Sequence, residues 1–180
     1  MTKLGILEGS LRNASLSRAA GRAAAGLVPD GMTAVALPNP GSLPLFNQDV
    51  LDEGMPDSVA AFMDAVDGVD ALLIVTPEYN WSIPGGLKNA IDWLSRRKPN
   101  PLSGKPATIW SVSPGLLGGA RVHEGLRHTL LSQSMLVMAT PEVQIATAKA
   151  KIDVETGQIT NADTEAFLQD HLSKFAAFCH

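Results

Sequence analysis

The segment Ala71–Thr76, with the sequence ALLIVT, is apolar throughout except for its last residue and is bounded by Asp70 and Pro77. An apolar run without polar alternation is typical of a strand covered on both faces, which occurs in parallel sheets packed between helices. Shorter apolar runs predict further strands at Lys3–Glu8, Thr33–Leu37 and Ala107–Val112. A fifth strand is predicted at Met135–Met138, with a possible continuation at Val143–Ile145.

Helical spacing of apolar residues separates these runs. It is found in residues 16–27, 59–66, 87–94, 119–133 and 168–179. Residues 38–54 are rich in Pro and Gly and are expected to form a loop. Alternating strands and helices imply parallel strands joined by right-handed crossovers. We therefore expect residues 1–180 to form a single α/β domain of three layers, whose doubly wound five-stranded sheet has the order 2-1-3-4-5.

Charge and cysteine content restrict the function and location. The net charge is −4 and there is no basic run, which disfavours nucleic-acid binding. The single cysteine favours a reducing compartment, and no apolar stretch approaches the roughly 20 residues of a membrane span. We expect a cytoplasmic protein without a membrane partner. Arg96, Arg97 and Lys98 form the one close cationic cluster, which fits either a helix end or a cofactor contact.

In a doubly wound sheet, ligands bind beyond the carboxyl ends of the strands, where the winding reverses. This rule predicts that three loops meet around one site: Gly9–Ser17, Pro77–Gly86 and Ser113–Gly119. The first has the sequence GSLRNASLS and leads into a helix, where free backbone N–H groups attract an anion. Alternatively, Ser15 is only a helix cap, and Arg12 and Arg18 lie in solvent.

The first loop lacks both the GxxxxGK[ST] and the GxGxxG patterns, so a single phosphate, as in a mononucleotide, fits it best. The four histidines have no metal-ligand spacing, and we predict no metal site. No GxSxG elbow is present, which argues against a hydrolase. Cys179 has no motif around it and is not expected to act as a nucleophile.

Four segments occur in an informative order: GSLRNASLSR at residues 9–18, LPLFNQD at 43–49, TPEYNWSIPGGLKNAID at 76–92 and SPGLLGGAR at 113–121. Together they resemble the NAD(P)H-dependent FMN reductase family, which includes quinone, chromate and azo reductases. The resemblance covers nearly the whole chain. It implies a flavodoxin-like fold and FMN as the bound cofactor.

The resemblance also implies the cofactor site. Its residues would be Ser10, Arg12, Ser15, Ser17, Pro77, Glu78, Tyr79, Asn80, Ser82, Ser113 and Gly115. The first four would hold the phosphate, and the family often has asparagine at the position of Ser17. For Glu78 a structural tie is favoured over a catalytic role, because hydride transfer to flavin needs no side-chain acid. No catalytic side chain is predicted.

The implied activity is a ping-pong cycle in which NADPH or NADH reduces the flavin, which then reduces a quinone, chromate, an azo compound or free flavin. Relatives form homodimers or homotetramers, so an intersubunit contact between Arg121 and Glu142 is expected. Some relatives carry tyrosine where this chain has Glu124, which puts tetramer stability in doubt. The alternatives are a flavodoxin-type electron carrier without NAD(P)H turnover, or a regulatory protein that kept only the fold.

Overall fold

The computed structural model describes residues 1–180 and contains one sheet of parallel strands. The strand order is β2-β1-β3-β4-β5, as predicted, and β6 also pairs with β4. The strands are β1 Thr2–Glu8, β2 Met32–Ala36, β3 Ala71–Thr76, β4 Pro106–Val112, β5 Leu136–Val137 and β6 Val143–Ile145. The fifth strand is thus interrupted, and both of its predicted pieces contact the same neighbour.

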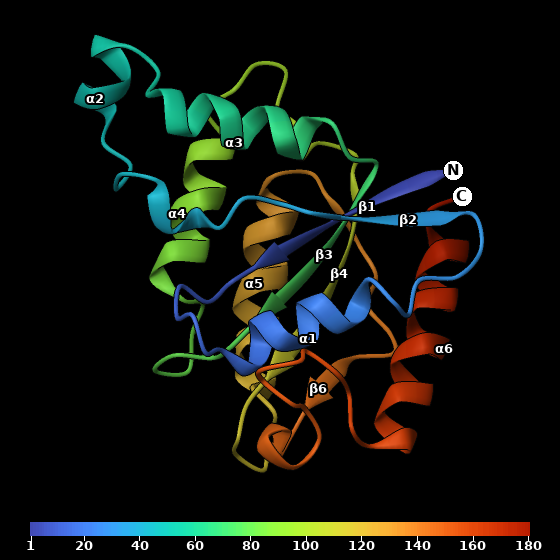
Figure 1. Ribbon diagram of the computed structural model, residues 1–180. Coiled ribbons are helices and arrows are strands. Elements are labelled where there is room, and N and C mark those ends of the chain that lie inside the picture. The colour runs from blue at the N-terminus through green and yellow to red at the C-terminus, as the bar shows by residue number, and fades with distance from the viewer.

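Helices cover both faces of this sheet (Figure 1). The helices are α1 Leu16–Ala24, α2 Gln48–Glu53, α3 Asp57–Asp67, α4 Gly85–Leu94, α5 Ala120–Ser132 and α6 Ala162–Phe178. Helices α1 and α6 pack on one face, and α3, α4 and α5 pack on the other. The result is the predicted three-layer, flavodoxin-like arrangement.

Strand β3 explains why its sequence shows no polar alternation. All six of its residues are buried. Leu72 and Ile74 enter the core beneath α3, α4 and α5, while Leu73 and Val75 enter the core beneath α1 and α6. Since full burial of one such side chain contributes about 1.5–3 kcal/mol, an apolar residue is favoured at every position.

The segment 38–54 differs from the expected loop. It contains a 3₁₀ turn at Pro40–Ser42 and the helix α2. Asn47 caps α2, since its side-chain oxygen accepts a hydrogen bond from the Asp49 N–H at 3.0 Å. No residue of α2 is buried, and Val50 and Leu51 are half-buried against the core, so a helix of six residues shows too little apolar periodicity to be predicted. None of the helices combines the length and apolarity that a membrane crossing requires.

Candidate functional site

The three predicted loops converge beyond the carboxyl ends of β1, β3 and β4, beside a cavity of about 600 Å³. Six of the expected site residues line it: Ser10, Arg12, Ser15, Ser17, Pro77 and Tyr79. Seven further residues complete the wall: Ala14, Leu16, Val112, Pro114, Lys149, Val154 and Glu155. The topological prediction of one shared site therefore matches the position of this cavity.

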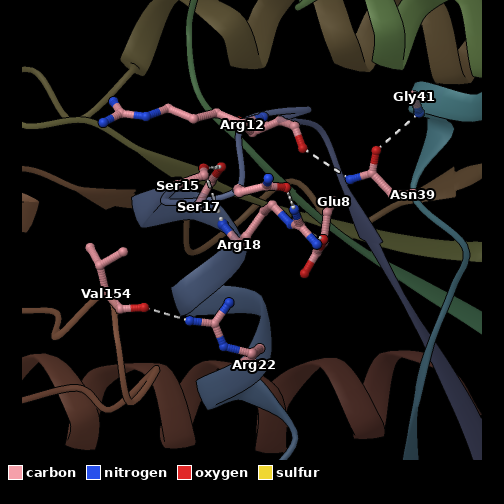
Figure 2. A network of polar contacts seen from close by, with 11 residues as sticks. Glu8, Arg12, Ser15, Ser17, Arg18, Arg22, Asn39, Gly41 and Val154 are labelled. Atoms are coloured by element: carbon pink, nitrogen blue, oxygen red, sulfur yellow. Dashed lines mark hydrogen bonds and ion pairs between the residues drawn. The ribbon is translucent and has the colours of Figure 1, made fainter.

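Three buried serines form the part of the wall next to α1. Ser10 and Ser17 are each 1% exposed, and Ser15 is 7% exposed. The hydroxyls of Ser15 and Ser17 lie 2.9 Å apart and share a hydrogen bond, while the Ser15 oxygen also accepts from the Arg18 N–H at 3.4 Å. Ser15 is therefore the cap of α1, as the simpler interpretation held, and it also lines the cavity. Figure 2 shows the Ser15 and Ser17 side chains together at the start of α1.

Arg12 of this loop and Arg18 of α1 point to opposite sides (Figure 2). Arg18 donates from Nε to the Glu8 carboxylate at 2.7 Å and from Nη1 to Asn13 Oδ1 at 3.3 Å. It lines a separate groove that also includes Glu8. The Arg12 side chain lines the main cavity and makes no ion pair or hydrogen bond within the protein. Only Arg12 thus offers this loop's charge to a ligand.

The first loop passes very close to the end of β3. A Cβ atom on Gly9 would lie 2.4 Å from Oγ1 of Thr76, a distance that no real side chain tolerates. Asn39 braces the loop from the other side: its Nδ2 donates to the Ser10 carbonyl at 3.1 Å, and its Oδ1 accepts from the Gly41 N–H at 2.9 Å (Figure 2). The loop is therefore held in place by close packing and by a neighbouring loop.

The second loop contains a tight hairpin. Tyr79 and Ser82 exchange two backbone hydrogen bonds, and the residues between them, Asn80 and Trp81, have φ values of 49° and 63°. Positive φ at both central residues is the requirement of a type I′ turn. The turn leaves Trp81 73% exposed, with the Arg121 guanidinium 4.7 Å from the ring centre. A tryptophan in the left-handed region carries a backbone cost, and such strained residues cluster at functional sites.

Glu78 ties the second loop to α5. Its carboxylate accepts from the Arg121 backbone N–H at 2.8 Å and lies 3.8 Å from the Arg121 guanidinium. The cap residue of α5 is Gly119, which has no side chain, so Glu78 supplies the missing acceptor. This is the structural tie that was expected of Glu78.

The remaining expected residues do not line the cavity. Asn80 and Ser82 belong to the hairpin turn, and Ser113 and Gly115 belong to the third loop, where Ser113 Oγ accepts from the Gly115 N–H at 3.1 Å. Arg121 and Glu142 do not contact each other within the chain, because Glu142 pairs with Arg127 at 2.8 Å. Their expected contact between subunits stays a prediction.

Sequence reasoning missed the wall formed by Lys149, Val154 and Glu155. These residues lie between β6 and α6, in a segment that matches none of the quoted motifs. Arg22 of α1 holds the segment, since its Nη2 donates to the Val154 carbonyl at 2.6 Å (Figure 2). The one local sequence feature that indicates a constrained turn here is Gly157. In the structure a Cβ at this position would lie 2.9 Å from Arg22 Nε.

The cationic cluster at the end of α4 is engaged elsewhere. Arg97 pairs with Asp64 and Asp67 of α3, and Arg96 lies 5.1 Å from the Phe46 ring centre. Neither lines the cavity, and the last turn of α4, which ends at Leu94, contains no basic residue. Beneath the third loop, burial lowers the pKa of His123, and its Nε2 lies 2.9 Å from Ser111 Oγ. A neutral His123 is consistent with a structural hydrogen bond.

Fold and cavity together define a mononucleotide-binding protein of the flavodoxin-like class. A volume of about 600 Å³ lies within the roughly 300–1,000 Å³ of cofactor pockets. Buried hydroxyls, an unpaired guanidinium and the start of α1 suit a phosphate, while Pro77 and the half-exposed Tyr79 suit a planar ring. The residues present thus fit FMN.

Comparison with known proteins gives the family. Residues 2–150 match the model of the NADPH-dependent FMN reductase family. A quinone reductase of Escherichia coli is 41% identical over 173 residues, covering 96% of this chain and 92% of that protein. An NAD(P)H-dependent FMN reductase of Pseudomonas aeruginosa is 43% identical over 169 residues, covering 94% and 90%.

A solved structure gives the same result. The flavoenzyme NAD(P)H:(acceptor) oxidoreductase of Paracoccus denitrificans superposes with a TM-score of 0.88 at 34% identity, covering 99% of this chain and 97% of that one. The chain therefore belongs to the NADPH-dependent FMN reductase family. FMN and NAD(P)H are the cofactors of such an enzyme, in agreement with the resemblance that the motifs indicated.

Proposed function

We propose that this protein is an NAD(P)H-dependent FMN oxidoreductase whose acceptors are quinones. The observation that carries the proposal is one cavity lined both by the buried Ser15 and Ser17 with the unpaired Arg12 and by Pro77 with Tyr79. One part suits a phosphate and the other a flat ring. The quinone reductase of Escherichia coli supports the acceptor class.

Bound FMN supplies the redox chemistry, in which hydride is taken from a nicotinamide and electrons are passed to an acceptor. The residues of this chain would bind the FMN and fix its orientation. Ser10, Arg12, Ser15 and Ser17 hold the phosphate, and Pro77 and Tyr79 lie along the ring. We propose that the other five expected residues shape the loops: Glu78, Asn80, Ser82, Ser113 and Gly115. No side chain is assigned a proton transfer.

We also propose that the protein forms a homodimer or a homotetramer through the loops around the cavity. Large apolar side chains are exposed on all three of these loops: Leu11, Tyr79, Trp81, Leu116 and Leu117. Exposed apolar side chains gathered at the carboxyl ends of the strands favour a subunit interface there. Sedimentation of the full chain tests this assembly, and a monomer at micromolar concentration would contradict it.

The single cysteine supports the expected cytoplasmic location.

The first experiment is an absorption spectrum of the purified protein before and after anaerobic addition of NADPH or NADH. Oxidised flavin bands that bleach within the mixing time support a reductase, and subsequent reoxidation by a quinone gives the acceptor. Parallel initial-rate lines against both substrates support the ping-pong cycle. The same assay with chromate, an azo compound and free flavin tests the other proposed acceptors.

A flavodoxin-type electron carrier is the second candidate, because it shares the fold. In that case bound flavin stays oxidised with both nicotinamides and turns over only when a separate reductase is added. A protein that binds no flavin contradicts both candidates and favours the regulatory alternative.

A further inference from the structure

We infer that Lys149 is the second cation that binds the phosphate monoester of the cofactor, a role that rests on the proposed FMN site. A phosphate monoester carries about −1.5 to −2 charges at neutral pH, so one arginine leaves it incompletely compensated. The charged side chains on the cavity wall are Arg12, Lys149 and Glu155. Arg18, a cation in the first turn of α1, is paired with Glu8 outside this cavity.

Lys149 is free to take a ligand. Its ammonium group makes no ion pair or hydrogen bond within the protein, and the same holds for the carboxylate of Glu155. The lysines of the two exposed i,i+4 pairs, Lys88 and Lys174, are by contrast already bound to aspartates. A lysine on the wall of a cavity, with unused donors, is a ready partner for phosphate oxygens.

The chain presents Lys149 from a fixed turn. Thr147 donates from its N–H to the Gly115 carbonyl at 3.1 Å, and Ala148 donates to the Ser113 carbonyl at 3.0 Å. Two of the expected site residues thus act through backbone carbonyls, by holding the turn that precedes the lysine. Ser113 and Gly115 therefore contribute to the site indirectly, although they do not line the cavity themselves.

The far side of the segment is fixed as well. Arg22 binds the Val154 carbonyl at 2.6 Å, and Asp153 Oδ1 accepts from the backbone N–H groups of Glu155 and Thr156 at 2.8 and 3.2 Å. Figure 2 shows the bond between Arg22 of α1 and the Val154 carbonyl. Lys149 and Glu155 are therefore attached to a braced piece of chain beside the phosphate-binding serines.

The charge of Glu155 should affect phosphate binding in the direction opposite to that of Lys149. Glu155 lines the same cavity as the two cations, and its negative charge reduces the positive potential that a phosphate meets. Removing the lysine charge should weaken phosphate binding, and removing the glutamate charge should strengthen it. A purely structural role for the segment predicts no such change of sign.

The test compares FMN with riboflavin, which has the same ring and lacks the phosphate. Dissociation constants of both flavins are measured by fluorescence quenching with the full chain. We expect Lys149→Gln to weaken FMN about tenfold and leave riboflavin unchanged, since a charged hydrogen bond contributes at least that much. We expect Glu155→Gln to strengthen FMN about threefold, as is typical of a partly screened charge.

Lys151→Gln is the matched control, because Lys151 lies two residues away and faces a different surface groove. It should change neither constant. Equal weakening of FMN and riboflavin by Lys149→Gln would overturn the inference, and so would an unchanged FMN constant. Wild-type protein that binds neither flavin would overturn the proposed function as well, which separates the two failures.

One further arm distinguishes two sources of the same chemistry, because NADPH also carries a phosphate monoester, at its 2′ position. The KM values for NADPH and NADH are measured with Lys149→Gln. An unchanged ratio of the two, together with weaker FMN binding, supports the assignment to the cofactor. A loss of NADPH preference with unchanged FMN binding overturns it in favour of the nicotinamide substrate.

Discussion

Residues 9–17, after β1, keep three serine side chains away from solvent, whereas residues 77–84, after β3, leave Trp81 and half of Tyr79 in it. The first loop is fixed by contact, with Gly9 against Thr76 and Asn39 against Ser10. The second is fixed by a turn in the left-handed region and by the carboxylate of Glu78. A small, charged group needs preset donors, while a ring that several acceptors must approach needs open surface.

The largest expected effect comes from Gly9→Val, which tests whether contact fixes the first loop. The new side chain would collide with Thr76, which is fully buried, and we expect the free energy of unfolding to fall by about 3 kcal/mol. FMN binding should be lost. Gly85→Ala is the control, since a Cβ there meets no atom within 4 Å, and urea denaturation compares the two. Equal stability of both variants would show that the loop is not held by packing.

The second prediction concerns Arg12 of the same loop and Arg18 of the helix that follows it. Arg12→Gln should weaken FMN binding about 30-fold, or about 2 kcal/mol, because a charged hydrogen bond is removed. Arg18→Gln should change the FMN constant by less than about threefold, because Glu8 already neutralises Arg18. Flavin titrations measure both. Equal effects of the two substitutions on FMN binding would contradict the assignment of Arg12, and not Arg18, to the cofactor.

The third prediction tests how the second loop is fixed. Glu78→Ala removes the acceptor at the start of α5, and we expect a loss of about 1 kcal/mol in unfolding free energy, as for a helix cap. Glu78→Gln keeps an acceptor and should recover most of it. If glutamine destabilises as much as alanine, the charge and not the hydrogen bond holds the loop.

The smallest effect on stability is expected for Trp81→Gly. Relief of the left-handed backbone contributes about 1 kcal/mol, and loss of the contact with Arg121 costs about the same. Unfolding free energy should therefore stay within about 0.5 kcal/mol. A loss above 2 kcal/mol would make the indole part of the fold and remove the contrast between the loops.

Local signals sufficed where a residue's neighbours in sequence decide its structure. The bounds of β3 were predicted as observed, because Asp70 and Pro77 delimit the apolar run. The meeting of three loops followed from strand order alone. The direction of Arg18 depends on Glu8 across the first loop, and the position of Glu155 depends on the bond between Arg22 and Val154, 132 residues apart in sequence. Such contacts leave no trace in a single sequence.

The interrupted fifth strand has a consequence for how the molecule opens. Strand β4 pairs with β3 over one continuous run of five residues, whereas on its other side the five pairings are divided between two residues of β5 and three of β6. Backbone amides along that outer edge should exchange with deuterium through small local openings, well before those of β1 and β3. The loops that follow β1 and β3 are then rooted in the slowest-exchanging strands, so the outer edge can fluctuate while these two walls of the cavity keep their shape.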